Sequence, residues 1–199
     1  EKWCQWAKER VPQFIRSNGL QRRPDGFLAA REVNFSNNCL GDVGVRSLLR
    51  MLFVLRLGVR VMKLFKNSMG RAGAHALMDW MVVTKVPIQE LHLSHNYIPR
   101  EGAVDILKAV AFNPAYPIEV GGGRGREPLW LRLEHNMVSK AEELLQAAEE
   151  QMKKIRELGG HSMRSGSVLT VSDQRVHNVP DGRHCPLAQV MYLAHQRDL

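Results

Sequence analysis

Cysteine is scarce in this chain of 199 residues, which has only Cys4, Cys39 and Cys185. The three cysteines are far apart and odd in number, so a disulfide framework is not expected. Unpaired thiols are typical of a reducing compartment, and we therefore expect the protein in the cytoplasm or the nucleus.

Long apolar runs are also missing. The most apolar stretch, residues 48–61, is interrupted by three arginines and a glycine, whereas a membrane-spanning helix needs about 20 apolar residues. The chain starts at Glu1 instead of Met, and its first ten residues are charged and contain two Trp, unlike a signal peptide. We expect no contact with a membrane, and the start is compatible with a piece of a longer protein.

No catalytic motif is present. The sequence has no G-x-S-x-G, H-E-x-x-H or C-x-x-C pattern, so we predict neither an enzyme nor a cofactor. The run GGGRGR at residues 121–126 leads into a predicted strand, whereas a phosphate-binding loop leads directly into a helix.

Two groups of side chains could be considered as metal ligands. His92, His95 and His135 could approach one another, but His92 and His95 are three apart in an extended segment and should face opposite sides. A second group, His177, His184 and Cys185, lacks a fourth ligand at a normal spacing. We predict no metal site.

Positive charge, in contrast, is in excess. The chain has 28 Lys and Arg against 20 Asp and Glu, a net charge of +8. Residues 1–30 carry six basic against three acidic side chains, residues 31–138 carry fourteen against nine, and residues 139–199 carry eight of each. The excess in the first two thirds indicates an acidic partner or nucleic acid.

A pattern of spaced apolar residues and an asparagine recurs four times. Residues 88–98, IQELHLSHNYI, match L-x-x-L-x-L-x-x-N-x-L, and residues 30–40, 59–69 and 128–138 repeat the pattern. The equivalent asparagines are Asn38, Asn67, Asn96 and Asn136, at intervals of 29, 29 and 40 residues. Six residues after each of the first three comes a glycine that begins a run with helical spacing of apolar residues.

A strand, a turn and a helix in about 29 residues resemble the ribonuclease-inhibitor-like class of leucine-rich repeats. The resemblance implies an α/β solenoid with a curved parallel sheet on its concave face, helices on its convex face and helical caps. We divide the chain into an N-terminal helical cap (1–29), about four repeats (30–158) and a C-terminal cap, linker or tail (159–199). The family is mostly a binding scaffold, so the resemblance leaves the activity open.

Four segments outside the repeat pattern have their own predictions. Residues 2–18 have one apolar helical face, and Pro12 should break or kink this segment into two short helices. The insertion at residues 113–127 contains two prolines and a glycine run, which predicts an irregular loop. Residues 168–171 favour a strand that extends the sheet. From Pro186, the apolar residues Leu187, Val190, Met191 and Ala194 predict a short amphipathic helix.

The repeat register also predicts which side chains a partner would meet on the concave face. They fall into four columns: Glu32, Val61, Glu90 and Trp130; Asn34, Lys63, His92 and Arg132; Ser36, Phe65, Ser94 and Glu134; and Asn37, Lys66, His95 and His135. Two of the columns are polar to basic, with Phe65 and Trp130 as aromatic anchors beside them. The alternative is that these are solvated strand faces without a partner.

We therefore predict a non-enzymatic protein–protein interaction scaffold or adaptor whose partner has an acidic surface. The predicted contacts are Lys63, Phe65, Lys66, His92, His95, Trp130, Arg132 and His135, with further loop contacts from Arg124 and Arg126. The alternative is an RNA-binding or nuclease-accessory module of a larger protein, which the net charge and the Arg/Gly loop favour. A regulator of GTPases is a third interpretation, for which no residue can be nominated.

Overall fold

The architecture comes from a computed structural model that describes residues 2–84, 86–138, 141–159, 168–172, 174–180 and 183–191. The described helices are α1 (Lys2–Ser17), α2 (Gly41–Val54), α3 (Arg71–Val83), α4 (Arg100–Phe112) and α5 (Ala141–Leu158). None of these described helices is both long and apolar enough to cross a membrane.

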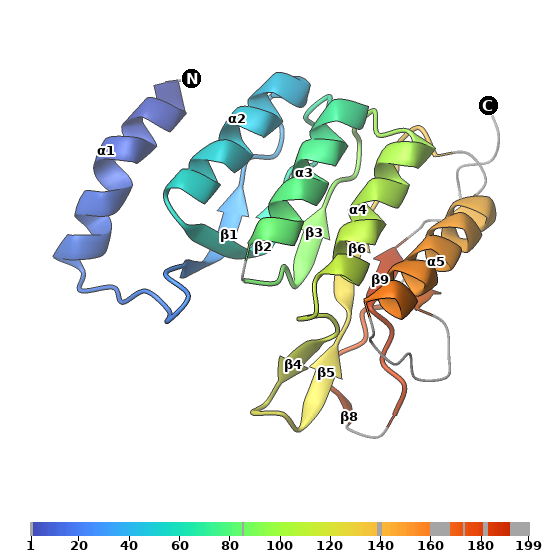
Figure 1. Ribbon diagram of the computed structural model, residues 1–199. Helices are drawn as coiled ribbons and strands as arrows, with labels where there is room; N and C mark the ends of the chain where they lie inside the picture. Colours follow the sequence, from blue (N-terminus) through green and yellow to red (C-terminus); the bar gives the residue numbers. More distant parts are fainter. Residues whose placement is uncertain are drawn as a thin grey trace.

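Two sheets accompany the helices (Figure 1). The larger has six parallel strands in the order β1 (Leu28–Asn34), β2 (Leu57–Lys63), β3 (Glu90–His92), β6 (Leu129–Arg132), β9 (Ala188–Met191) and β7 (Leu169–Val171). The smaller contains β4 (Ile118–Val120), β5 (Gly125–Glu127) and β8 (Val179–Pro180). Helices α2 to α5 lie side by side over one face of the larger sheet (Figure 1). We call the opposite face, on which no described helix lies, the open face.

The predicted repeats are confirmed at the level of a parallel α/β arrangement. Val33 pairs with Met62 and Met62 with Leu91, which are steps of 29 residues, and Leu91 pairs with Leu131, a step of 40. Side chains that point from the strands towards the helices are buried, and Met62, Leu91 and Leu131 are 0% exposed. The alternation of buried and partly exposed residues along each strand follows from its two-residue period.

The repeat asparagines connect the turns of neighbouring repeats through hydrogen bonds. Asn96 accepts hydrogen bonds through Oδ1 from the backbone N–H groups of Asn67 (3.0 Å) and Met69 (2.9 Å). Its Nδ2 donates to the carbonyls of Leu64 (3.0 Å) and Leu93 (2.9 Å). Buried backbone groups need partners, and one amide here satisfies groups from two successive turns.

The first helix is continuous, so the prediction of two short helices on either side of Pro12 is wrong. Buried residues lie on both sides of the proline, with Ala7 at 0% and Ile15 at 9% exposure. Because both halves of α1 are packed in this way, burial offsets the hydrogen bond that the proline cannot donate. The helix lies beside α2 at the β1 end of the sheet (Figure 1).

The insertion at residues 113–127 is a β-hairpin, not the irregular loop expected from its prolines and glycines. Strands β4 and β5 pair antiparallel, and Gly121, Gly122 and Gly123 have positive φ angles in the turn that joins them. Tyr116 fastens the insertion to the sheet, because its buried hydroxyl donates to the Ile88 carbonyl (3.0 Å) and accepts from the Ile88 N–H (2.8 Å).

The C-terminal part of the chain continues the larger sheet. The predicted strand at residues 168–171 is confirmed, since β7 forms an edge of the sheet. The helix predicted from Pro186 is wrong for its described residues, because Ala188–Met191 form β9 between β6 and β7; Ala194 lies outside the described residues. Ala188, Gln189 and Val190 are each at most 1% exposed, and a short strand buried on both faces does not show the alternation that would distinguish it from a helix.

Candidate functional site

The first two columns predicted on the concave face are present on the open face of the sheet, whereas Ser94 and Glu134 of the third predicted column are buried. The strand registers align Glu32, Val61, Glu90, Trp130 and Gln189 in one column, and Asn34, Lys63, His92, Arg132 and Met191 in the next. The order of the first four members in each column is the order that the repeats predicted. The repeat predicts the register in which neighbouring strands pair, because a slip of one residue would turn the apolar side chains of a strand away from the helices.

The fourth predicted column lies beyond the ends of the strands, in the turns. Asn37, Lys66, His95 and His135 all adopt left-handed backbone conformations, with φ between 55° and 60°. All four are exposed. The imidazole rings of His95 and His135 lie against each other with a centroid separation of 4.2 Å. The sequence thus predicted this pair of neighbouring histidines correctly.

The charge of these histidines depends on their surroundings. Slight burial, together with the nearby His135 and Lys66, lowers the pKa of His95. Protonating one imidazole beside a second and beside an ammonium group is unfavourable because like charges repel. The Lys66 ammonium group therefore lies beside an imidazole, that of His95, whose protonation is disfavoured.

Several of the predicted basic contacts are neutralised within the protein. Lys63 Nζ lies 2.9 Å from Glu32 Oε1, and Arg132 Nη2 lies 2.8 Å from Glu134 Oε1. The side chain of Glu134 is only 3% exposed, so Arg132 compensates a carboxylate that would otherwise be buried without a countercharge. These two basic residues have structural partners, whereas no described carboxylate forms a salt bridge with Lys66.

The two aromatic anchors have different environments. Phe65 is partly exposed on the open face, as expected. Trp130 was also expected to face a partner, but it is 7% exposed. Glu90 and Gln189 are its neighbours in the column, and residues 174–176 are hydrogen-bonded to both neighbours, which places this segment across Trp130. The tryptophan is therefore covered in this structure, and a partner can contact it only after displacing residues 174–176.

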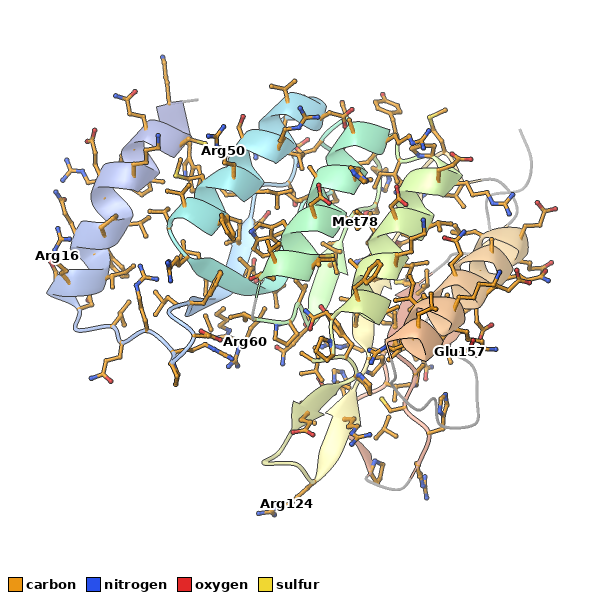
Figure 2. The ribbon with its side chains drawn as sticks, viewed as in Figure 1. Arg16, Arg50, Arg60, Met78, Arg124 and Glu157 are labelled. Carbon is orange, nitrogen blue, oxygen red and sulfur yellow. The ribbon has the colours of Figure 1, made fainter. Side chains whose placement is uncertain are left out.

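The structure does not bring the two loop arginines to the fourth column. Arg126 is in β5, which ends just before β6 begins, whereas His135 follows the other end of β6. Figure 2 shows Arg124 at the tip of the hairpin, where it points away from the rest of the protein. Any contact made by Arg124 would be separate from the contacts of Lys66 and the histidine pair.

A second cluster on the open face was not predicted. Arg175 forms salt bridges with Glu90 and Glu127, and its backbone neighbours are hydrogen-bonded to Gln189. Glu127 and the C-terminal residues lie outside the repeat pattern, so no periodicity assigns them to the sheet. Within the part of the chain that the structure describes, no group of three His, Cys, Asp or Glu side chains is arranged to hold a metal ion.

Comparisons with known proteins do not identify a family. No protein-family model matches the chain, and no curated protein matches it. One matching solved structure is titled "Leiomodin-1 Actin-Binding Site 2 (ABS2)", with 19% sequence identity and a TM-score of 0.48. The match covers 62% of this chain and 64% of that chain, less than two thirds of either.

Proposed function

We propose that this chain is a short leucine-rich repeat solenoid of the ribonuclease-inhibitor-like subclass, and that it is a non-enzymatic module that binds a protein partner. The partner has an acidic surface and contacts the row formed by Lys66, His95 and His135 in the turns that follow the strands. The observation that carries the proposal is this exposed row on successive turns, beside the partly exposed Phe65. Aromatic and basic side chains gathered on an exposed face are typical of interaction hot spots.

The ion pairs determine which substitutions test the proposal. Reversing the charge of Lys63 or Arg132 would break a salt bridge, and for Arg132 would leave Glu134 buried without compensation. Such variants would report on folding as well as on binding. Lys66 and His95 are exposed and outside these pairs, so their substitution leaves both salt bridges intact.

The test is affinity capture from a native lysate by the double variant Lys66→Glu/His95→Glu. We expect the wild type to retain a set of proteins in nuclease-treated lysate, and the double variant to lose that set at unchanged thermal stability. Arg71→Glu is the matched control, because Arg71 is exposed at the start of α3 on the helix-covered side. An identical set of captured proteins for the wild type and the double variant would contradict the proposal.

Binding should also respond to pH. Because neighbouring positive charges lower the pKa of His95, an acidic partner that binds there stabilises the protonated imidazole. Binding therefore strengthens as the pH falls from 8 towards 6, and the same measurement on Lys66→Glu/His95→Glu should show a smaller change.

RNA binding is the second candidate, and it rests on Arg124. This arginine lies exposed at the tip of a glycine-rich hairpin (Figure 2), and the chain has a net charge of +8. If RNA is the partner, its affinity should fall steeply with salt, because each phosphate contact releases counterions. In that case nuclease treatment removes the captured proteins, and Arg124→Glu weakens binding of a single-stranded RNA probe.

A further inference from the structure

The segment at residues 174–180 crosses the open face. It follows β7 at one edge of the larger sheet and ends in β8, which pairs with β5 of the hairpin. Between these strands, residues 174–176 lie over the column that contains Glu90, Trp130 and Gln189. We call residues 174–176 the crossing segment.

Gln189 binds the backbone of the crossing segment on both sides of Arg175. Its Oε1 accepts a hydrogen bond from the Val176 N–H at 2.8 Å, and its Nε2 donates to the Gln174 carbonyl at 2.7 Å. The Gln189 side chain is 1% exposed, so its position is fixed by its surroundings. A side-chain amide that pairs with one N–H and one C=O holds an extended backbone in the way that a neighbouring strand would.

Two carboxylates bind the side chain of Arg175. Glu90 Oε1 accepts from its Nη1, and Glu127 Oε2 lies 3.8 Å from its Nη2. The carboxylates come from different sheets, since Glu90 is in β3 and Glu127 is in β5. A guanidinium group presents donors in a planar fork and can bridge two separate acids, which the single ammonium of a lysine does less well.

The crossing segment itself contributes little apolar burial. Gln174 and Val176 are exposed, and Val176 retains 42% of its surface. Apart from local hydrogen bonds between Gln174 and Ser172, what holds the segment is therefore the polar contacts with Gln189, Glu90 and Glu127. These contacts involve the backbone and one arginine, so none of them requires the segment to belong to the same chain.

We propose that Glu90, Glu127 and Gln189 form a binding site for an extended peptide segment that carries an arginine, and that residues 174–176 occupy this site in cis. The occupant from another protein would place its arginine between the two carboxylates and its backbone against Gln189. This site lies at the other end of the strands from Lys66 and His95, and so it goes beyond the function proposed above.

Because residues 174–176 occupy the site in cis, they lower the apparent affinity of the site for a peptide added in trans. A tethered segment has a high effective concentration at its site, and a free peptide binds only to the fraction of molecules in which the site is vacant. Weakening the contact of Arg175 should therefore increase the affinity for a peptide added in trans.

The experiment uses the full chain and a fluorescent nine-residue peptide with the sequence of residues 172–180, SDQRVHNVP. In Arg175→Asp, repulsion by Glu90 and Glu127 expels the crossing segment while the three site residues are unchanged. Fluorescence anisotropy at low salt should show that the peptide binds Arg175→Asp at least about tenfold more tightly than the wild type, the order expected for loss of a charged contact in cis. Arg175→Ala removes the same contact without repulsion and serves as the second variant if Arg175→Asp is unstable.

Four controls define the result. Adding Glu90→Gln and Glu127→Gln to Arg175→Ala should weaken peptide binding about tenfold, and a peptide with alanine in place of its arginine should not bind. Arg183→Asp changes the charge at an exposed position outside the site and should resemble the wild type. Lys66→Glu/His95→Glu should leave peptide binding unchanged, so failure of this site and failure of the proposed function are distinguishable.

Hydrogen exchange reports whether the crossing segment leaves the site. The Val176 amide should exchange faster in Arg175→Asp than in the wild type, because its bond to Gln189 is lost. Peptide affinity that is equal in the wild type, Arg175→Asp and Arg175→Ala, or that survives the Glu-to-Gln substitutions, would overturn the proposal.

Discussion

At the scale of single residues, the repeat asparagines differ in how many groups each one satisfies. Asn96 is 5% exposed and bonds to backbone groups of Asn67, Met69, Leu64 and Leu93. Asn38 occupies the same position in the first repeat, but it is exposed and donates only to the Ser36 carbonyl, at 2.8 Å. Asn38 belongs to the repeat at the edge of the sheet, so among the described residues no turn of an earlier repeat is available to bond with it.

This difference predicts unequal costs for the same substitution. Asn96→Ala leaves two N–H groups and two carbonyls without their partner, and we expect the free energy of unfolding to fall by about 3 kcal/mol or more. Asn38→Ala should cost less than about 1 kcal/mol, since its lost partner can bond to water. Denaturant unfolding of both variants measures the two values, and equal losses would contradict this role of the asparagines.

At the scale of elements, the start of α3 is capped by a residue of the preceding helix. Asp42, in the first turn of α2, accepts through Oδ1 from the N–H groups of Gly70 (2.7 Å) and Gly73 (2.9 Å). The capping residue of α3 itself, Gly70, has no side chain to do this. The carboxylate therefore satisfies N–H groups that a helix leaves free at its start, and it lies at the positive end of the helix dipole.

Removing this contact should loosen two neighbouring repeats at once. Asp42→Ala is expected to lower the free energy of unfolding by about 1–2 kcal/mol, the usual cost of losing a helix cap. Asp42→Asn keeps the acceptor oxygen and removes only the charge, so it should retain more than half of that stability. Chemical denaturation of the two variants checks this, and an equal loss for both would show that charge alone matters.

The elements also differ in how well the sequence predicts them. The strands β1, β2, β3 and β6 and the helices between them follow from the repeat, because period and burial agree there. The hairpin at residues 118–127 and strand β9 do not follow from it. A glycine run is compatible with a loop or a tight turn, and Leu187 and Val190 fit a helix or a buried strand equally well.

At the scale of the whole molecule, acid weakens the fold through groups on the open face. Burial lowers the pKa of His92, and the hydrogen bond to Glu90 offsets this only in part. Burial also acts to raise the pKa of Glu90, but hydrogen bonds from Arg175 and His92 outweigh it and lower the pKa. Both His92 and Glu90 thus release their protons more readily in the folded chain than in the unfolded chain.

Both pKa shifts lower the free energy of unfolding when the pH falls. The unfolded chain takes up a proton on His92 below about pH 6.5 and on Glu90 below about pH 4.3, before the folded chain does, so stability falls through each range. We expect the thermal midpoint of the wild type to fall in two stages as the pH is lowered from 8. His92→Gln should reduce the first stage, to which His95 also contributes because its pKa is lowered as well, and should keep the second stage; a first stage of unchanged size would contradict the assignment to His92.

The candidate site was predictable only where it repeats. The column of Lys63, His92 and Arg132 and the neighbouring His95 and His135 follow from the register of the strands. The salt bridges that neutralise Lys63 and Arg132 depend on side-chain geometry that spacing does not specify. Arg175 is 85 residues from Glu90 in the sequence, and no local pattern connects the two.

The insertion of β9 between β6 and β7 has a consequence for synthesis on the ribosome. In the larger sheet, β1, β2, β3 and β6 can pair in the order in which they emerge, each on the previous strand of that sheet. The free edge of β6 at Leu129–Arg132 then waits for a partner until residue 191 has left the ribosome. An unpaired apolar strand edge can pair with other chains. The nascent protein is therefore most exposed to aggregation while residues 133–191 are being translated, when a chaperone that covers this edge would have its greatest effect.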